Sequence, residues 1–296
     1  MENALNVFFR RKLSSRYITR RLFQLSVLKL SLFRKRQALK FFFQENKPID
    51  IKLKDNTYIS CHSRIEAFHL CMYYFVANKL GIYSSKELIA IHNLSNTLNT
   101  DLERVFSKDE ILRSATGASP YFTITLLALY ALIRYLKPDD IVQTGVASGV
   151  SSSLILLALK LNDKGKLVDI DLPNRKKEGY VYSDGTIDAV YTPNELDPGW
   201  LIPNDLRGRW NLKLGPSREV LPKIEKCNIF FHDSEHSYEN MTFEFEWAYS
   251  KLSGPGLLAS DDINANDSWK DFHIKHTDLL PLMGHLELGI SLKNAV

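Results

Sequence analysis

The chain has 296 residues, enough for one large domain or for one domain with an appendage. Hydrophobic residues make up 45% and charged residues 24%, which excludes a wholly disordered, collagen-like or coiled-coil chain. No apolar stretch reaches the length of a membrane span. Cys61, Cys71 and Cys227 are far apart and lack CxxC spacing. This pattern argues against a disulfide scaffold or a zinc cluster and fits a reducing compartment, so we expect a cytoplasmic protein.

Positive charge is concentrated in residues 1–44, which hold eleven Lys and Arg against one acid, Glu2. Residues 45–296 hold 27 bases and 33 acids, so we expect no nucleic-acid partner for the body. Apolar residues spaced by three and four predict an amphipathic helix in this basic leader. Arginines interrupt any apolar core of a secretory signal. Three roles stay open: packing on the body, peripheral contact with an anionic membrane or a partner, and targeting as a transit peptide.

Residues 45–116 have the pattern of a helical cap, with a strand pair within 50–60 and helices over 63–80 and 86–113. From 117 to 296 helices alternate with short apolar strands. The predicted helices are 121–136, 151–161, 217–224 and 238–252, and the predicted strands are 140–144, 167–171, 210–214, 228–232 and 257–260. The alternation predicts an α/β fold: a Rossmann-like, doubly wound, mostly parallel sheet with helices on both faces. Ligands bind such sheets at the carboxyl ends of the strands.

Two motifs at these ends favour a ligand that contains a nucleoside. The turn Gly145-Val-Ala-Ser-Gly149 joins the first strand to its helix, where glycines permit close backbone approach and the helix offers free N–H groups. Helix–strand packing alone would also explain these glycines. Asp171 ends the second strand and is placed to accept hydrogen bonds from ribose hydroxyls. Asp169 shares its face, but Asp171 is nearer the strand end. The alternative for Asp171 is a cap or turn role.

Two further motifs carry acids at the ends of the fourth and fifth strands. The exit His232-Asp233-Ser-Glu-His236 combines carboxylates with imidazoles, and the i, i+3 spacing of Asp233 and His236 would align them in a helical turn. A capping role for Asp233 or Ser237 is the alternative. Asp261 and Asp262 would repel unless a cation, a proton or hydrogen bonds relieve them. Together with Asp233 they offer the oxygen ligands that Mg²⁺ prefers. The other histidines (His62, His69, His92, His273, His276 and His285) show no ligand spacing.

In order, these motifs resemble the class I S-adenosylmethionine-dependent methyltransferases over roughly residues 117–296. The segments that carry the resemblance are Val142–Ser151, Lys166–Asp171, Leu214–Pro222, Phe231–Glu239 and Gly254–Asp262. Within that class, the small-molecule O-methyltransferases similar to macrocin O-methyltransferase and to cephalosporin hydroxylase-like proteins are the most similar subgroup. The resemblance leaves residues 1–116 unexplained.

The resemblance implies roles for particular residues. Asp233, Asp261 and Asp262 would bind Mg²⁺, and His236 would be the general base. The residues that would contact the cofactor are Gln143, Gly145, Ser148, Gly149, Asp171, Ser217 and Asp233. Two of the positions depart from the family pattern. Gln143 stands where an acid commonly precedes the glycine loop, and Pro216 stands where an acid often lies near the adenine, which makes Ser217 the better candidate there.

The expected function is therefore metal-assisted O-methylation of a small-molecule hydroxyl, with a sugar as the favoured acceptor. A catalytically silent cofactor-binding module tethered by the leader is the alternative that Gln143 and Pro216 suggest. A nucleotide-dependent oxidoreductase is a third, because a ribose-binding Asp also suits NAD. The sequence leaves open whether copies of the chain form a homo-oligomer.

We predict that removing residues 1–44 lowers binding to anionic vesicles and leaves cofactor affinity unchanged, because the leader has an excess of ten positive charges whereas the rest of the chain has an excess of six negative ones. Vesicle co-sedimentation and calorimetry of the full and truncated chains measure the two quantities. Equal vesicle binding by both chains would exclude the surface role.

Overall fold

The computed structural model describes residues 49–53, 55–61, 64–106, 122–172, 180–181, 187–188, 196–285 and 288–293. The basic leader with its predicted helix, and the predicted boundary at 116/117, lie outside these ranges. Within them, no helix is both long and apolar enough to span a membrane.

The centre of the molecule is a seven-stranded sheet with the order β10-β11-β9-β8-β3-β4-β7. Its five parallel strands are β3 (Asp140–Thr144), β4 (Lys166–Asp171), β7 (Trp210–Leu214), β8 (Cys227–His232) and β9 (Leu252–Ser260). The last two strands are antiparallel to their neighbours: β11 (Leu288–Lys293) pairs with β9 and with β10 (Leu279–His285). The order reverses between β3 and β8, which is the switch point where doubly wound sheets bind ligands. The predicted fold class is confirmed.

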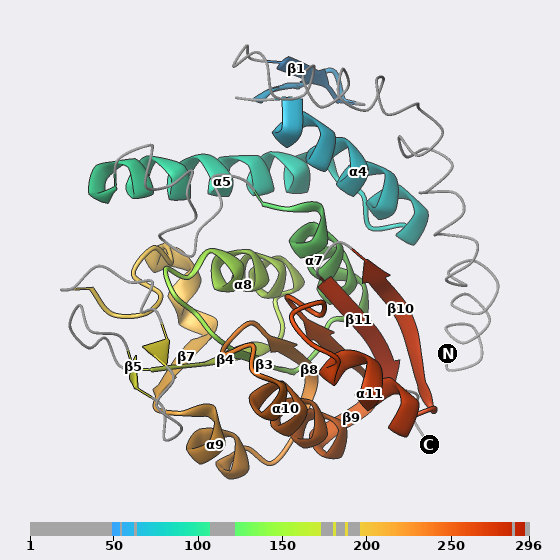
Figure 1. Ribbon diagram of the computed structural model, residues 1–296. Helices are drawn as coiled ribbons and strands as arrows, with labels where there is room; N and C mark the ends of the chain where they lie inside the picture. Colours follow the sequence, from blue (N-terminus) through green and yellow to red (C-terminus); the bar gives the residue numbers. More distant parts are fainter. Residues whose placement is uncertain are drawn as a thin grey trace, which may run out of the picture.

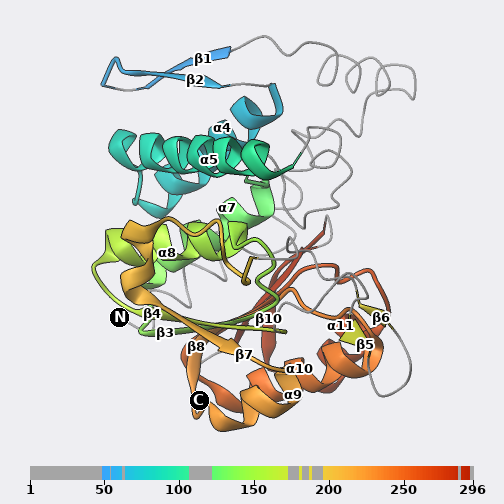
Figure 2. The ribbon, with the colours of Figure 1, turned by 90° about the vertical axis from the view of Figure 1, so that its left-hand side faces the viewer.

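Helices cover both faces of this sheet, as Figures 1 and 2 show. One face carries α7 (Ile124–Leu136) and α8 (Val150–Asn162), and the other carries α9 (Ser217–Val220), α10 (Tyr238–Lys251) and α11 (Ser268–Lys275). A further helical layer lies on α7 and α8; it consists of α4 (Arg64–Leu80) and α5 (Ser85–Val105), topped by the hairpin of β1 (Ile49–Lys52) and β2 (Tyr58–Cys61). The short elements are β5 (Tyr180–Val181), β6 (Ile187–Asp188), η2 (Asn204–Arg209) and η3 (Leu221–Lys223).

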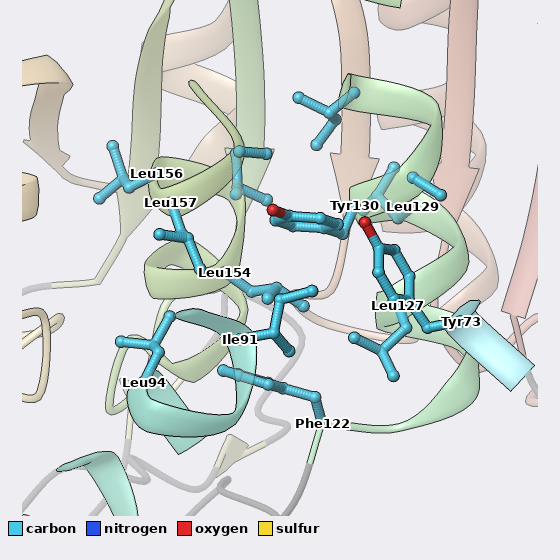
Figure 3. Packing of buried hydrophobic residues seen from close by; sticks show 14 of the residues in the cluster. Tyr73, Ile91, Leu94, Phe122, Leu127, Leu129, Tyr130, Leu154, Leu156 and Leu157 are labelled. Atoms are coloured by element: carbon cyan, nitrogen blue, oxygen red, sulfur yellow. The ribbon is translucent and has the colours of Figure 1, made fainter. Parts of the chain in front are cut away.

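The helical layer formed by α4 and α5 shares its hydrophobic core with the sheet. One cluster of buried side chains runs from Ile91 of α5 through Tyr130 of α7 and Leu156 of α8 to Phe231 of β8. Figure 3 shows residues of α5, α7 and α8 meeting in this cluster. Because buried apolar area is the main favourable term in folding, the layer and the sheet stabilise one another.

A buried carboxylate fixes the same helices to each other. Glu87 of α5, which is 5% exposed, accepts hydrogen bonds from the hydroxyls of Tyr73 (2.9 Å) and Tyr130 (2.8 Å) and from Arg134 Nε (2.8 Å). Arg134 also donates to Asn162 at the end of α8. The contacts join α4, α5, α7 and α8, and they supply the partners that a buried charge requires.

The structure departs from the predicted elements at the carboxyl-terminal end. The strands β10 and β11 were not predicted, because Pro281, Gly284 and Gly289 interrupt their pattern. Pro281 lies on an edge strand, where a missing N–H is tolerated. Gly289 lies against Trp269, where a Cβ would come within 2.4 Å of the ring. The helix predicted over 217–224 ends at Val220, and Pro222 lies in the 3-10 turn that follows.

Candidate functional site at the switch point

The glycine loop meets the exit of β8 at very short range. Gly145 has φ +79°, and a Cβ there would lie 1.7 Å from the carbonyl oxygen of Asp233. The Asp233 N–H donates to Thr144 O (2.9 Å), and the Gly145 N–H donates to Ile170 O (2.9 Å). The exits of β3, β4 and β8 are thereby bonded to one another. Only glycine allows this approach, so Gly145 has a structural requirement beyond helix–strand packing.

The remainder of the glycine loop is covered by residues 196–203. The N–H groups of Gly199 and Leu201 donate to Ala147 O (2.8 Å) and Ser148 O (3.0 Å). Ser148 is fully buried beneath this cover, and Gly149 is the N-cap of α8. Arg207 holds the covering segment by donating to Gly199 O (2.9 Å). Arg207 therefore has a structural role in holding this segment over the loop.

Asp171 lies at the end of β4, beside the glycine loop. Its Oδ2 accepts hydrogen bonds from the N–H groups of Val146 and Ala147, both at 2.8 Å, and its Oδ1 accepts one from Leu172 N (2.6 Å). The turn role that the sequence allowed for Asp171 is therefore present.

Asp169 lies on β4 two residues before Asp171 and is fully buried. Its Oδ2 accepts from Trp210 Nε1 at 2.7 Å. Burial raises the pKa of Asp169 to about 7, although hydrogen bonds from Ser152 and Trp210 act in the opposite direction. Asp169 is buried before the end of β4, whereas Asp171 is the last residue of the strand. These positions agree with the choice of Asp171 as the candidate ligand residue.

Gln143 occupies the position where the family pattern has an acid. It is fully buried, and its Nε2 donates to Gly145 O (2.7 Å) and Ser151 Oγ (2.8 Å). Its Oε1 is also buried and has no hydrogen-bond partner among the described residues. An unsatisfied buried acceptor is costly, and a ligand N–H group next to the glycine loop would satisfy it.

Acidic side chains from three strand ends lie close enough to affect one another. Burial raises the pKa of Asp233 well above its usual range, and the charges of Asp261, Asp262 and Asp171 raise it further, as does a hydrogen bond with Asp261. The Asp261 N–H also donates to His232 O (2.8 Å), which joins the exits of β8 and β9. The acids that the sequence placed at separate strand ends are therefore brought together. In the arrangement seen here Asp233, Asp261 and Asp262 do not form a close three-oxygen metal group.

The loop between Asp233 and His236 differs from its predicted form. Residues 233–237 precede α10 and are not helical, so the helical turn that would align Asp233 with His236 is not formed. Ser237 is the N-cap of α10 and accepts from Asn240 N (3.2 Å), which leaves Asp233 free of the capping role. The His236 ring packs edge-to-face on His232, with ring centroids 5.1 Å apart. The His236 carbonyl accepts from Asn266 Nδ2 (2.9 Å).

Glu244, which sequence reasoning missed, anchors this loop from below. It is fully buried in α10 and accepts from Thr144 Oγ1 (2.6 Å), His232 Nδ1 (2.6 Å) and Ser234 Oγ (3.0 Å). Burial alone would raise the pKa of Glu244, but the interaction with His232 and the hydrogen bonds lower it below its usual value. In the sequence, Glu244 has helical spacing from the apolar residues Met241 and Ala248, and this spacing could have indicated that it is buried.

Ser217 belongs to the same polar network. Its Oγ donates to Asn240 Oδ1 (3.3 Å), and Asn240 Nδ2 donates to Glu244 Oε1 (3.1 Å). The start of α9 is thus tied to α10 beneath the loop of Asp233. A direct contact of Ser217 with a cofactor remains a prediction.

The seven-stranded sheet and the glycine loop at its switch point are those of the doubly wound α/β class. A family model described as a methyltransferase domain matches residues 142–263, from β3 to the loop after β9. The matched segment, which is less than half of the chain, is similar to methyltransferase domains, and this confirms for it the expected resemblance to the class I S-adenosylmethionine-dependent methyltransferases. A search of curated proteins finds no match to the sequence.

Solved structures with low sequence identity resemble the chain. The methyltransferase PaMTH1 of Podospora anserina, bound to SAH, shares 10% identity over 92% of this chain and 99% of its own, with a TM-score of 0.47. The O-methyltransferase NovP shares 16% over 70% of this chain and 99% of its own, also with a TM-score of 0.47. TomG of Streptomyces achromogenes, an O-methyltransferase in complex with SAM, shares 14% over 66% and 95%, with a TM-score of 0.43.

We predict that Gly145→Ala destabilises the protein far more than Gly81→Ala. Both glycines have positive φ, +79° and +73°, but a Cβ at Gly81 has no atom within 4 Å. Gly81→Ala should cost about 1 kcal/mol from backbone strain alone. Gly145→Ala should cost roughly 2 kcal/mol more, because the Asp233 backbone must move. Urea unfolding followed by circular dichroism measures both, and equal losses would contradict the role given to Gly145.

We predict that Asp169→Asn makes stability less dependent on pH. The folded state raises the pKa of Asp169 to about 7, so its stabilising contribution is complete below about pH 4 and is lost as pH rises through 7. Relative to the native chain, the variant should gain stability between pH 4 and 8, on the order of a few kcal/mol. Unfolding free energies across this range test it, with the exposed Asp197→Asn as control. An identical pH profile for Asp169→Asn and the native chain would contradict it.

Proposed function

We propose that the chain is an S-adenosylmethionine-dependent O-methyltransferase that acts on a small-molecule hydroxyl, with metal assistance. The observation that carries the proposal is the convergence of four acids beside the glycine loop, where the charges of Asp261, Asp262 and Asp171 raise the pKa of the buried Asp233. Such a concentration of acids is costly by itself and is typical of a functional site. The methyltransferase domain over residues 142–263 supplies the reaction class.

The residues around the glycine loop fit the proposed cofactor. Gln143 Oε1 is a buried acceptor that an amino group would satisfy, which is why glutamine can replace the usual acid. Asp171 would bind the ribose hydroxyls, and the loop N–H groups orient its carboxylate. In this proposal Gly145, Ser148 and Gly149 shape the backbone around the ligand, and Ser217 lies on the adenine side.

The acidic cluster fits a divalent cation in its donor chemistry. Asp233, Asp261 and Asp262 offer only oxygen ligands, and a bound cation would relieve the repulsion that raises the pKa of Asp233. With Mg²⁺ held there, the chemistry supplied is a lower pKa for a coordinated hydroxyl. Because three oxygens are not yet close together, we propose that substrate and water complete the coordination.

The proposed reaction needs alignment and removal of one proton. The cofactor supplies a methyl group on a sulfonium, which is a good leaving group, so the protein chiefly orients the acceptor oxygen. His236 would accept the hydroxyl proton, since an imidazole titrates near physiological pH. Glu244 fixes His232, and His232 packs on the His236 ring, so Glu244 would act as a positioning residue for the base. A sugar hydroxyl is the acceptor we favour, on the strength of the family resemblance alone.

The test combines calorimetry with S-adenosylmethionine, with and without Mg²⁺, and methyl transfer to a panel of sugar and small-molecule hydroxyls. We expect cofactor binding by the native chain and Mg²⁺-dependent transfer. His236→Ala should retain binding and lower turnover about 10²- to 10⁴-fold, because only proton removal is lost. Asp233→Asn should abolish the dependence on Mg²⁺. Asp267→Asn, an exposed acid at the start of α11, is the matched control and should change neither.

Three outcomes would contradict parts of the proposal. Unchanged turnover in both His236→Ala and Asp233→Asn would remove the assigned roles. Tight cofactor binding without transfer to any acceptor would favour the silent module that Gln143 and Pro216 suggest. Binding of NADH in a fluorescence titration, without binding of S-adenosylmethionine, would favour an oxidoreductase.

A further inference from the structure

A second group of metal-ligand side chains lies far from the sheet ends, in the helical layer. Cys61 ends β2, Glu66 lies in the first turn of α4, and His92 lies in the middle of α5. All are buried, with exposures of 0%, 3% and 8%. One donor atom from each lies within 4.8 Å of the other two. Among the residues that the structure describes, no other group of three His, Cys, Asp or Glu side chains is this close. The sequence showed no ligand spacing for His92, because the donors come from three elements.

Contacts at both ring nitrogens fix the orientation of the His92 imidazole. Glu66 Oε1 lies 2.8 Å from His92 Nδ1, on the side that faces the group. On the other side, Asn96 Nδ2 lies 3.0 Å from His92 Nε2. Histidines that bind metals almost always have their second ring nitrogen held by another group. Rotation of the Asn96 amide by half a turn presents its oxygen to an Nε2–H, which frees Nδ1 for a cation.

The donor set has the chemistry of a zinc site. Thiolate, imidazole and carboxylate bind Zn²⁺ at about 2.0 to 2.3 Å, which places donor atoms about 3.3 to 3.8 Å apart in a tetrahedron. The group therefore needs only small side-chain adjustments to close around an ion. A bound cation would offset the negative charges of a thiolate and a carboxylate in this buried group.

We propose that Cys61, Glu66 and His92 form a buried structural site for a thiophilic divalent ion of the Zn²⁺ type, with water as the fourth ligand. The ion would fasten the β1–β2 hairpin to α4 and α5. The site is separate from the acidic cluster at the switch point: Figures 1 and 2 show the hairpin on the far side of the helical layers from the sheet. Its soft donor also distinguishes it from the oxygen-only cluster, so Mg²⁺ should not compete.

The experiment uses the full chain after treatment with a chelator, titrated with Co²⁺ as a spectroscopic probe. We expect one equivalent to produce a thiolate-to-cobalt charge-transfer band and the visible bands of tetrahedral cobalt. Zn²⁺ should displace it stoichiometrically and raise the melting temperature, whereas excess Mg²⁺ should not displace it. Absence of the band at stoichiometric Co²⁺ would overturn the proposal, whatever the outcome of the methyltransferase assays.

Variants locate the site. Cys61→Ser should remove the charge-transfer band and weaken Zn²⁺ binding at least 100-fold, whereas Cys71→Ser, at an exposed cysteine of α4, should retain both. Asn96→Ala should weaken Zn²⁺ binding about 10- to 100-fold while keeping the band, because it removes only the support of His92. If Cys61→Ser fails to fold, Asn96→Ala decides: unchanged affinity in that variant overturns the proposal. A band that survives in folded Cys61→Ser also overturns it.

Discussion

The site depends on the contact between the glycine loop and the exit of β8. Gly145 and the carbonyl of Asp233 are closer than any residue with a side chain would allow. This contact fixes two things at once: the direction in which the chain leaves β3 and the place where Asp233 begins its loop. The Asp261 N–H then bonds the next strand exit to the same edge. The convergence of acids is therefore a result of backbone geometry at the switch point, and each acid needs only to follow its own strand.

Buried carboxylates hold the layers of the molecule in register. Glu87 joins the outer helices to α7, Asp169 receives the indole N–H of Trp210 under the sheet end, and Glu244 joins the sheet to α10. Their surroundings differ, and so do the shifts in pKa. The interaction with His232 and several hydrogen bonds hold the pKa of Glu244 below its usual value, whereas the hydrogen bonds to Asp169 do not offset its burial and its pKa rises. The neighbours of a buried acid, charged groups as well as hydrogen-bond donors, thus set the direction of its pKa shift.

The sequence predicted those parts of the fold that local patterns determine. The strands at 140–144 and 210–214 have the predicted bounds, because a short apolar run between turn residues leaves little choice. The strand at 288–293 escaped prediction because its Gly289 is required by Trp269, a residue on another element. The acids of the candidate site were predictable because each ends a strand. Glu244 and the trio of Cys61, Glu66 and His92 depend on tertiary packing, and the helical turn expected at Asp233 gave way to an irregular loop capped by Ser237.

The hydrophobic core that the sheet shares with α5, α7 and α8 limits how short a fragment of this chain can fold. The family match begins at Val142, inside β3, and ends at Ile263, before the two antiparallel strands. A fragment cut at those positions would lose α7 and the hairpin of β10 and β11, exposing Leu156, Phe231 and Ala259 to water. Expression of the matched segment alone should therefore give an aggregating chain. We therefore expect the autonomously folding unit to be larger than residues 142–263 and to include α4, α5 and α7.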